Sequence, residues 1–267
     1  MWGIVPAAGL GSRIQPLAFS KELLPVGSRR EGMIERPCAV SEYLVERMIR
    51  GGADKICFVI SPGKSDIVEY FGGSYGPATI AYVVQPQPVG LCDAIFRATP
   101  LVDDNEAVLV GLPDTIWFPE TALAELPDML SFLLFPVERP EFFDVVLLDE
   151  TGRVRQILVK QKEPGSNWIW GAFKMPGRVL RDLHRLWQDR NGRDEYIGSL
   201  VNAYLAAGGE AVGIKAGRAY VDVGTLNGYR AAMNLLENSG PASAPGTAWP
   251  ELGDQAGLRR IAQAKMR

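Results

Sequence analysis

Residues 4–25 read IVPAAGLGSRIQPLAFSKELLP, a short apolar segment that runs into a glycine-containing loop. The apolar start predicts a first β-strand. Gly9 and Gly11 allow the loop backbone to approach a ligand and to point its N–H groups at phosphate oxygens, and Arg13 and Lys21 carry the positive charge that a phosphate needs. An ordinary strand-to-helix turn would suit the glycines but would give the two cations no role. The stretch therefore predicts a phosphate-binding loop.

Two common nucleotide motifs do not fit the spacing of the glycines. A dinucleotide fingerprint needs a third glycine where Ile14 stands. The triplet Gly63-Lys64-Ser65 lacks the glycine that a Walker loop needs five residues before its second glycine, where Phe58 stands. The phosphate-binding loop is therefore of another kind.

Short apolar runs alternate with helical patterns through the first half of the chain. Residues 40–50 predict a helix, because apolar residues recur at i, i+4, i+5, i+8 and i+9 and Gly51-Gly52 follows. Continuous apolar strands separated by short helices indicate βαβ units and a parallel sheet buried on both faces. The other elements expected in this half are strands at 3–6, 56–60, 80–85 and 107–111 and helices at 65–71 and 91–98.

After residue 131 the pattern becomes richer in strands, and the turn at residues 149–152 predicts a hairpin. We therefore expect an α/β fold with a mixed, mainly parallel central sheet flanked by helices, and with a β-rich elaboration on the substrate side. Residues 1–237 form one domain, and the Pro, Gly, Ser and Ala that follow predict a linker and a short C-terminal tail over residues 238–267. The expected elements are strands at 132–137, 144–148, 154–159, 168–174, 211–214 and 219–223 and helices at 179–188, 197–207 and 227–237.

The composition narrows the possible functions. The 267 residues carry 28 Lys and Arg against 31 Asp and Glu, a net charge of -3, which leaves no broad basic face for nucleic acid. His184 is the single histidine and the three cysteines lack metal spacing, so Ser–His–Asp triads, disulfides and structural zinc are not expected. The apolar runs are far shorter than the ~20 residues that span a bilayer, and the N-terminus lacks a signal peptide pattern, so we expect a cytoplasmic protein without a membrane partner. Its chemistry then rests on carboxylates, Lys and Arg.

The segment QPQPVGL, residues 85–91, lies between an expected strand and an expected helix, where a parallel sheet opens its ligand crevice. The Gln85 amide can donate to and accept from a pyrimidine edge, and Gly90 leaves room for the base. A proline-rich turn without a ligand is the alternative interpretation.

Two aspartates occur next to apolar strands in separate parts of the chain. Asp114 comes just after the strand expected at 107–111, and Asp222 lies in the strand expected at 219–223. A lone aspartate in such a position is more often a helix cap or a turn former than a metal ligand.

These motifs together resemble those of the nucleoside-diphosphate-sugar pyrophosphorylases, also called sugar-1-phosphate nucleotidyltransferases. The family's G-x-G-[TS]-R-x-x-P and K-x-L-L-P elements match residues 9–25, with a shorter stretch between them than is usual, and its Q-P-x-P-x-G-L matches residues 85–91. LPDTIW at 112–117 resembles its L-G-D-[ND]-I-F, with proline in place of glycine. YVDVGT at 220–225 resembles its W-x-D-x-G-T, with tyrosine in place of tryptophan.

The resemblance implies the family's Rossmann-like nucleotidyltransferase fold, with residues 1–237 as the catalytic domain. It implies transfer of a nucleotidyl group from dTTP or UTP to a sugar 1-phosphate, such as glucose 1-phosphate, with Mg²⁺ as cofactor and pyrophosphate as the second product. A homo-oligomer, either a dimer or a tetramer, is expected on the same ground. The residues implied are Ala8, Gly9, Gly11, Ser12, Gln85 and Gly90 for the nucleotide, Arg13, Lys21 and Lys162 for catalysis on the phosphates, and Asp114 and Asp222 for magnesium.

The sugar side departs from the family's pattern. KQKEP resembles the family's E-K-P, with Lys162 at the lysine that meets the sugar phosphate and Gln161 where the family has Glu. Asp144 stands where a glycine that contacts the sugar is usual. Glu195 is the sugar contact that the resemblance implies, with a solvated helix start as the alternative interpretation. Gly171 is expected to bind the sugar in the same pocket, although the aromatic residues beside it would suit a core equally well.

Two other functions remain open at this point. The replacements at Pro113, Asp144 and Gln161 are compatible with a non-catalytic nucleotide-sugar sensor that keeps the fold. An alditol-phosphate or molybdopterin nucleotidyltransferase would share the glycine loop, but residues 85–91 and 221–225 fit it less well.

Overall fold

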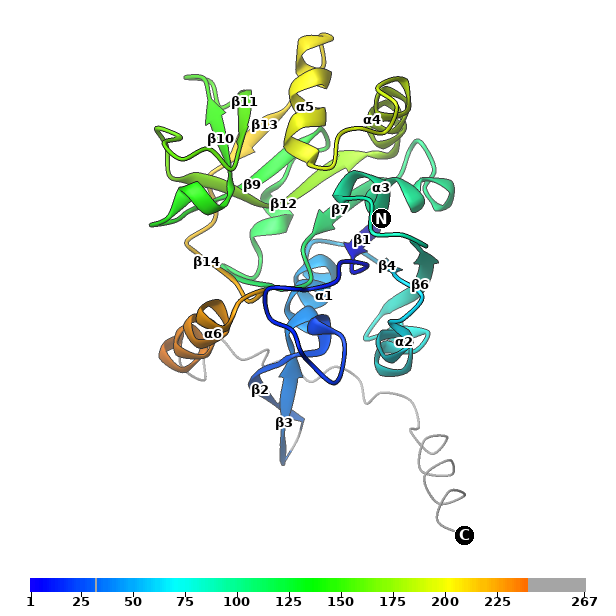
Figure 1. Cartoon of the computed structure of the whole chain (residues 1–267), viewed down its shortest axis with the longest axis vertical. Coiled ribbons are helices and arrows are strands. Elements are labelled where there is room, and N and C mark those ends of the chain that lie inside the picture. The colour runs from blue at the N-terminus through cyan, green and yellow to red at the C-terminus, as the bar shows by residue number, and fades with distance from the viewer. Residues whose placement is uncertain (32, 240–267) are drawn as a thin grey trace.

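The computed structural model describes residues 1–31 and 33–239, and its centre is an extended sheet (Figure 1). The strands in this part of the chain are β1 (Trp2–Pro6), β2 (Pro25–Glu31), β3 (Ile34–Ala39), β4 (Lys55–Ile60), β5 (Ser74–Tyr75), β6 (Ala78–Val84), β7 (Ala107–Gly111), β8 (Thr115–Phe118), β9 (Ser131–Pro136), β10 (Asp144–Leu148), β11 (Val154–Val159), β12 (Trp168–Pro176), β13 (Val212–Ile214) and β14 (Ala219–Asp222). The helices are α1 (Val40–Arg50), α2 (Ser65–Phe71), α3 (Leu91–Arg97), α4 (Gly177–Asp189), α5 (Ile197–Ala206) and α6 (Leu226–Ser239).

The first half of the chain forms the parallel centre of the sheet. The strand order is β11-β10-β12-β7-β1-β4-β6-β5, and β1 pairs in parallel with both β4 and β7. Ile4 and Val5, adjacent on β1, are fully buried in two different hydrophobic clusters. One cluster includes residues of α3, α4 and α5, and the other includes residues of α1 and α2. Helices therefore cover both faces of the sheet, as the continuous apolar strands predict.

The second half of the chain adds antiparallel strands to the same sheet. β12 pairs antiparallel with β7 and β9, and β10 and β11 form the predicted hairpin. The Asp149 carboxylate closes the hairpin turn by accepting hydrogen bonds from the backbone N–H groups of Thr151 (2.8 Å) and Arg153 (3.0 Å). The predicted fold class, a mixed sheet with a parallel centre and a β-rich elaboration, is confirmed.

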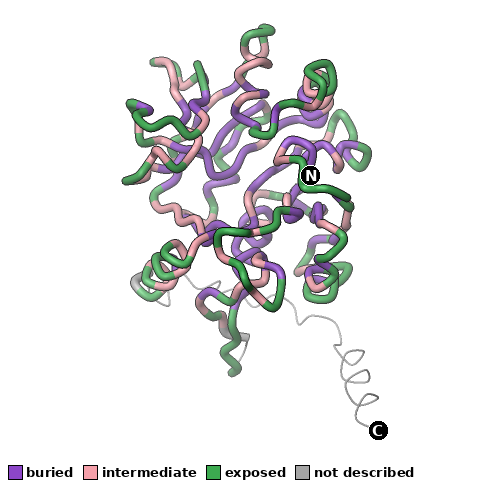
Figure 2. The backbone as a smooth tube through the Cα atoms, in the orientation of Figure 1, coloured by how far each residue is buried: buried purple, intermediate pink, exposed green. Residues whose placement is uncertain are grey.

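Two small antiparallel sheets lie outside the main sheet, and the sequence patterns predict neither of them. β8 pairs with β14, and β2 pairs with β3 in a hairpin that extends away from the body of the protein (Figure 1). Charged residues interrupt the apolar pattern of this hairpin, and much of it is exposed (Figure 2). Its base is fixed by Glu42 of α1, a fully buried carboxylate that pairs with Arg29 and accepts hydrogen bonds from Tyr70 and Tyr75.

The last described element is α6, which ends two residues beyond the predicted boundary at residue 237. The predicted linker and tail at 238–267 fall outside the described residues from position 240 onward. Among the helices that the structure describes, none is both long enough and apolar enough to cross a bilayer.

The central strand allows a direct test of the fold. Replacing Ile4, which is fully buried, with alanine should lower the free energy of unfolding by about 2–5 kcal/mol, because it leaves a cavity between packed helices and sheet. The matched change Ile34→Ala, at a position 56% exposed on β3, should alter it by less than about 1 kcal/mol. Urea unfolding measures both, and equal effects would contradict the placement of β1 at the centre.

Candidate active site

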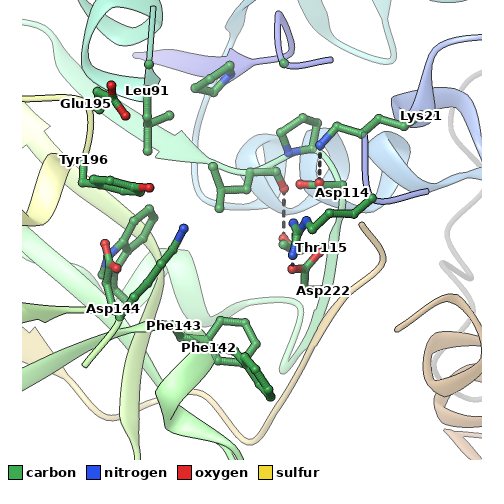
Figure 3. Close-up of a pocket in the computed structure, with 18 of the residues that line it drawn as sticks. Lys21, Leu91, Asp114, Thr115, Phe142, Phe143, Asp144, Glu195, Tyr196 and Asp222 are labelled. Atoms are coloured by element: carbon green, nitrogen blue, oxygen red, sulfur yellow. Dashed lines mark hydrogen bonds and ion pairs between the residues drawn. The ribbon is translucent and has the colours of Figure 1, made fainter. Parts of the chain in front are cut away.

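A cavity of about 420 Å³ opens next to the glycine-containing loop, beyond the carboxyl ends of β1 and β7. Open sheets with a parallel centre bind ligands at this edge. Figure 3 shows two groups of side chains facing each other across the cavity: Lys21, Asp114 and Asp222 on one side, and Asp144, Glu195 and Tyr196 on the other. The predicted site residues that line the cavity are Gly9, Arg13, Lys21, Gly90, Asp114, Glu195 and Asp222.

The pairing of β8 with β14 brings the two aspartates together. Asp222 lies opposite Thr115 in this small sheet, and the Val223 N–H donates to the Asp114 carbonyl oxygen over 2.8 Å. A Cβ placed on Gly224 would lie 2.8 Å from Asp222 Oδ1 and 3.2 Å from Asp114 Oδ2. Arg13 Nη2 would lie 3.0 Å from the same point. Glycine at this position therefore permits the two carboxylates and the guanidinium group to come close together.

Two cations balance the carboxylate pair. Lys21 Nζ lies 2.5 Å from Asp114 Oδ2, and Arg13 Nη2 lies 3.4 Å from Asp222 Oδ2 (Figure 3). Lys21 and Asp114 are both largely buried, whereas the Arg13 side chain is 64% exposed. The tight ion pair is thus on the Asp114 side, and Asp222 has the weaker partner.

The pKa values of the two aspartates move in opposite directions. Burial acts to raise the pKa of Asp114, but the charge and hydrogen bond of Lys21 outweigh it, so the pKa is lowered. Burial raises the pKa of Asp222, and the negative charge of Asp114 raises it further. Asp222 is therefore short of positive charge, as expected where a cation or cationic group is to bind.

The donor set suits a hard divalent cation such as Mg²⁺. Asp114 and Asp222 are the two carboxylates that meet beside Gly224, and no group of three or more His, Cys, Asp or Glu side chains gathers as a metal site in the described part of the chain. A cation held by two carboxylates takes its remaining ligands from water and from substrate oxygens, which is the usual arrangement for Mg²⁺ on phosphates.

The glycines of the loop have different roles. A Cβ on Gly9 would meet nothing within 4 Å, so the loop is open to a ligand there. Gly11 has a φ of +65°, and a Cβ on it would lie 2.8 Å from Lys21 Cδ. Gly11 therefore lets the lysine stem pass close to the loop backbone. Ala8 and Ser12, also predicted to bind nucleotide, do not line the cavity, and neither does Gly11.

Gln85 does not line the cavity, although the sequence predicts that it reads a base. Its side chain is buried, and its amide donates to Asp93 Oδ2 (2.7 Å) and to the Gly90 carbonyl oxygen (3.2 Å). Gly90 has a φ of +110°, and a Cβ on it would lie 2.9 Å from Glu195 Cα. Gln85 thus braces the loop that packs Gly90 against the backbone of Glu195.

The lysine that the structure brings to the cavity is Lys160, whereas the predicted Lys162 is exposed and does not line it. Lys160 Nζ lies 4.6 Å from the centre of the Tyr196 ring. Lys160 is the first residue after β11, and Asp114 is the third residue after β7. The position of Lys160 directly after an expected strand was the signal in the sequence that would have favoured it over Lys162.

Gly171 belongs to the core. A Cβ on it would lie 2.6 Å from the Phe135 ring and 2.7 Å from the Tyr220 ring, so glycine permits these rings to pack. Its neighbour Trp170 lines the cavity instead, together with Asp144. Burial raises the pKa of Asp144, and its Oδ1 is buried without a hydrogen-bond partner.

Comparisons with known proteins identify relatives of this chain. A family model described as nucleotidyl transferase matches residues 2–239. The glucose-1-phosphate thymidylyltransferase of Neisseria meningitidis serogroup A is 28% identical over 248 residues, which cover 89% of this chain and 83% of that protein. The UTP–glucose-1-phosphate uridylyltransferase AglF of Haloferax volcanii is 23% identical over 223 residues, covering 78% and 85% respectively.

A solved structure shows the same fold. A Bacillus anthracis protein provisionally named glucose-1-phosphate thymidylyltransferase, in complex with a sucrose, superposes with a TM-score of 0.75 at 24% identity. The match covers 87% of this chain and 94% of that one.

The unequal environments of the two aspartates predict opposite effects on stability. Asp222→Asn should raise the free energy of unfolding by on the order of 1 kcal/mol, because it removes a carboxylate repelled by Asp114. Asp114→Asn should lower it by about 1–3 kcal/mol, because Lys21 loses its buried partner. Urea unfolding in a chelating buffer measures both, and a loss of stability in Asp222→Asn would contradict this description.

Proposed function

The chain belongs to the nucleotidyl transferase family, and we propose that it transfers the nucleotidyl group of dTTP or UTP to a sugar 1-phosphate, glucose 1-phosphate or a similar hexose, and releases pyrophosphate. The relatives named above for glucose 1-phosphate support this choice of substrates. The observation that carries the proposal is the cluster of Arg13, Lys21, Asp114 and Asp222 at the carboxyl edge of the sheet.

The reaction needs no covalent intermediate on the protein. An oxygen of the sugar phosphate attacks the α-phosphorus of the triphosphate, a new P–O bond forms, and the bond to the β-phosphate oxygen breaks. The attacking oxygen is already anionic at neutral pH, so no histidine or other base has to remove a proton. The task of the protein is to align two anions and to offset their repulsion.

The cations of the loop perform most of this task on the nucleotide side. Lys21, held at a fixed place by Asp114 and by its passage against Gly11, offers positive charge to the phosphates. Arg13 is largely exposed and free to turn from Asp222 toward the departing pyrophosphate. Asp114 and Asp222 would hold Mg²⁺, which supplies polarisation of the α-phosphoryl group when it is bound.

The opposite side of the cavity is suited to the acceptor. Lys160 is the cation there and would bind the phosphate of the sugar 1-phosphate. Asp144 and Glu195 offer carboxylate oxygens to the sugar hydroxyls, and Trp170 and Tyr196 offer flat apolar faces to the ring. This side lies across the cavity from Lys21 and the two aspartates, as a transfer between two bound phosphates requires (Figure 3).

The direct test is a panel of triphosphates and sugar 1-phosphates, incubated with the purified protein and Mg²⁺ while pyrophosphate is measured. We expect release that depends on both substrates, with dTTP or UTP preferred. Lys21→Ala or Asp222→Asn should lower turnover by about 100-fold or more, because each removes charge that acts on the reacting phosphates.

Circular dichroism shows whether these variants remain folded. Near-normal pyrophosphate release from either folded variant would overturn its assignment. Binding of the substrates without any release by the wild-type protein would contradict catalysis and favour a non-catalytic sensor.

The two lysines near the end of β11 provide a matched pair. Lys160→Ala should raise the KM for the sugar 1-phosphate or lower turnover by about tenfold or more, because the acceptor phosphate loses its cation. Lys162→Ala, two residues away and exposed, should change both constants by less than about twofold. A large effect of Lys162→Ala and a small effect of Lys160→Ala would instead assign the acceptor phosphate to Lys162.

A further inference from the structure

The triplet Gly63-Lys64-Ser65, which does not form a Walker loop, contains a buried lysine that the proposed chemistry does not use. We propose that Lys64 is a positioning residue, which fixes the phosphate-binding loop and so places Lys21 for the reaction. The inference rests on the proposed function, because it assigns a role in binding the triphosphate.

The Lys64 ammonium group joins both ends of the loop. Its Nζ donates to the Ala7 carbonyl oxygen over 2.6 Å and to Glu22 Oε1 and Oε2 over 2.8 Å each. An ammonium group has three N–H donors, so these contacts use all of them. Ala7 lies at the start of the loop and Glu22 directly follows Lys21, so one side chain ties the two ends of the loop together.

A second residue at the start of α2 supports the same clamp. Asp66 accepts hydrogen bonds from the backbone N–H of Ser20 (2.6 Å) and from its hydroxyl (2.7 Å). The residues on both sides of Lys21, Ser20 and Glu22, are thus attached to residues 64–66. Lys21 has an anchored neighbour on each side, and its direction toward Asp114 follows from this arrangement.

Lys64 also removes an unfavourable charge from the cavity. Glu22 is among the residues that line the cavity, yet its side chain is fully buried. An unpaired carboxylate there would repel a triphosphate and would compete with Asp114 for Lys21. The Lys64 side chain is 10% exposed and pairs with Glu22 in an environment that screens little, so it neutralises this carboxylate effectively.

A purely structural ion pair would make a different prediction. Breaking it would lower stability but would leave the binding of the two substrates unchanged in the molecules that remain folded. A positioning role changes the kinetic constants for the triphosphate and spares those for the acceptor, because Lys64 contacts only the nucleotide side.

The test compares three variants with the wild-type protein. Lys64→Met keeps most of the side-chain volume and removes the charge, Glu22→Gln removes the carboxylate charge, and the double variant removes both. We expect Lys64→Met to raise the KM for the triphosphate by about tenfold or more and to lower kcat, with the KM for the sugar 1-phosphate within about twofold of wild type. The double variant should recover a large part of the loss in KM, because no unpaired carboxylate is left.

The control is Lys55→Met. Lys55 pairs with Glu106 at the opposite, amino end of β4 and should affect neither KM. If Lys64→Met alone fails to fold, the double variant, which leaves no buried unpaired charge, is compared directly with the wild-type protein. A KM for the triphosphate equal to that of wild type would then overturn the inference.

Four outcomes separate the possibilities. An unchanged KM for the triphosphate in folded Lys64→Met would overturn the inference, and so would equal changes for both substrates. A double variant that recovers nothing would overturn the charge argument. Absence of pyrophosphate release by the wild-type protein would instead reject the proposed function, so the two failures are distinguishable.

Discussion

The charge balance of the site depends on two carboxylates that lie close together in a largely buried position. Asp114 and Asp222 lie close together because β8 and β14 pair, and the absence of a side chain at Gly224 permits this approach. Two neighbouring negative charges are unfavourable unless positive charge is supplied. Lys21 supplies positive charge for Asp114, so the uncompensated negative charge is that of Asp222. The repulsion between the two carboxylates lowers the stability of the protein without ligand. A ligand that brings cations can offset this repulsion.

The rest of the fold serves to hold this cluster at a sheet edge. The parallel pairing of β1 with β4 and β7 places the phosphate-binding loop beside the end of β7, which leads to Asp114. The antiparallel strands β10 to β12 then build the opposite wall, which carries Lys160 and Asp144. Positive charge is divided between the walls: Arg13 and Lys21 lie on one side of the cavity and Lys160 on the other. A few cations gathered at one cavity thus supply local positive charge in a chain with a net charge of -3.

The sequence predicted most of the fold because its signals are local. Apolar runs such as residues 56–60 and the periodic helix at 40–50 need no distant partner to be recognised. The hairpin of β2 and β3 was missed because its charged residues hide the strand pattern, and its contacts are with distant elements: Arg29 pairs with Glu42 of α1, and Val26 packs in a cluster that includes residues of α6. The association of Asp114 with Asp222 was expected only through the family resemblance.

The site was predicted less completely than the fold, for reasons seen in single residues. Lys162 fits a motif better than Lys160, yet the backbone after β11 brings Lys160 to the cavity. Gln85 has the right chemistry for a base, but its amide is already engaged by Asp93 and Gly90. Lys64 has no motif at all, and only the folded chain shows that it reaches Ala7 and Glu22.

We propose that the cluster around Asp114 and Asp222 promotes attack on the α-phosphorus of a nucleoside triphosphate. This proposal is tested most directly by following two labels separately, ³²P in the α-phosphate and ³²P in the γ-phosphate, during incubation with a sugar 1-phosphate and Mg²⁺. Nucleotidyl transfer places the α-label in the sugar product and the γ-label in pyrophosphate, and this is the result we expect. Transfer of the γ-label to the sugar, or its release as inorganic phosphate while the α-label stays on the nucleotide, would contradict it.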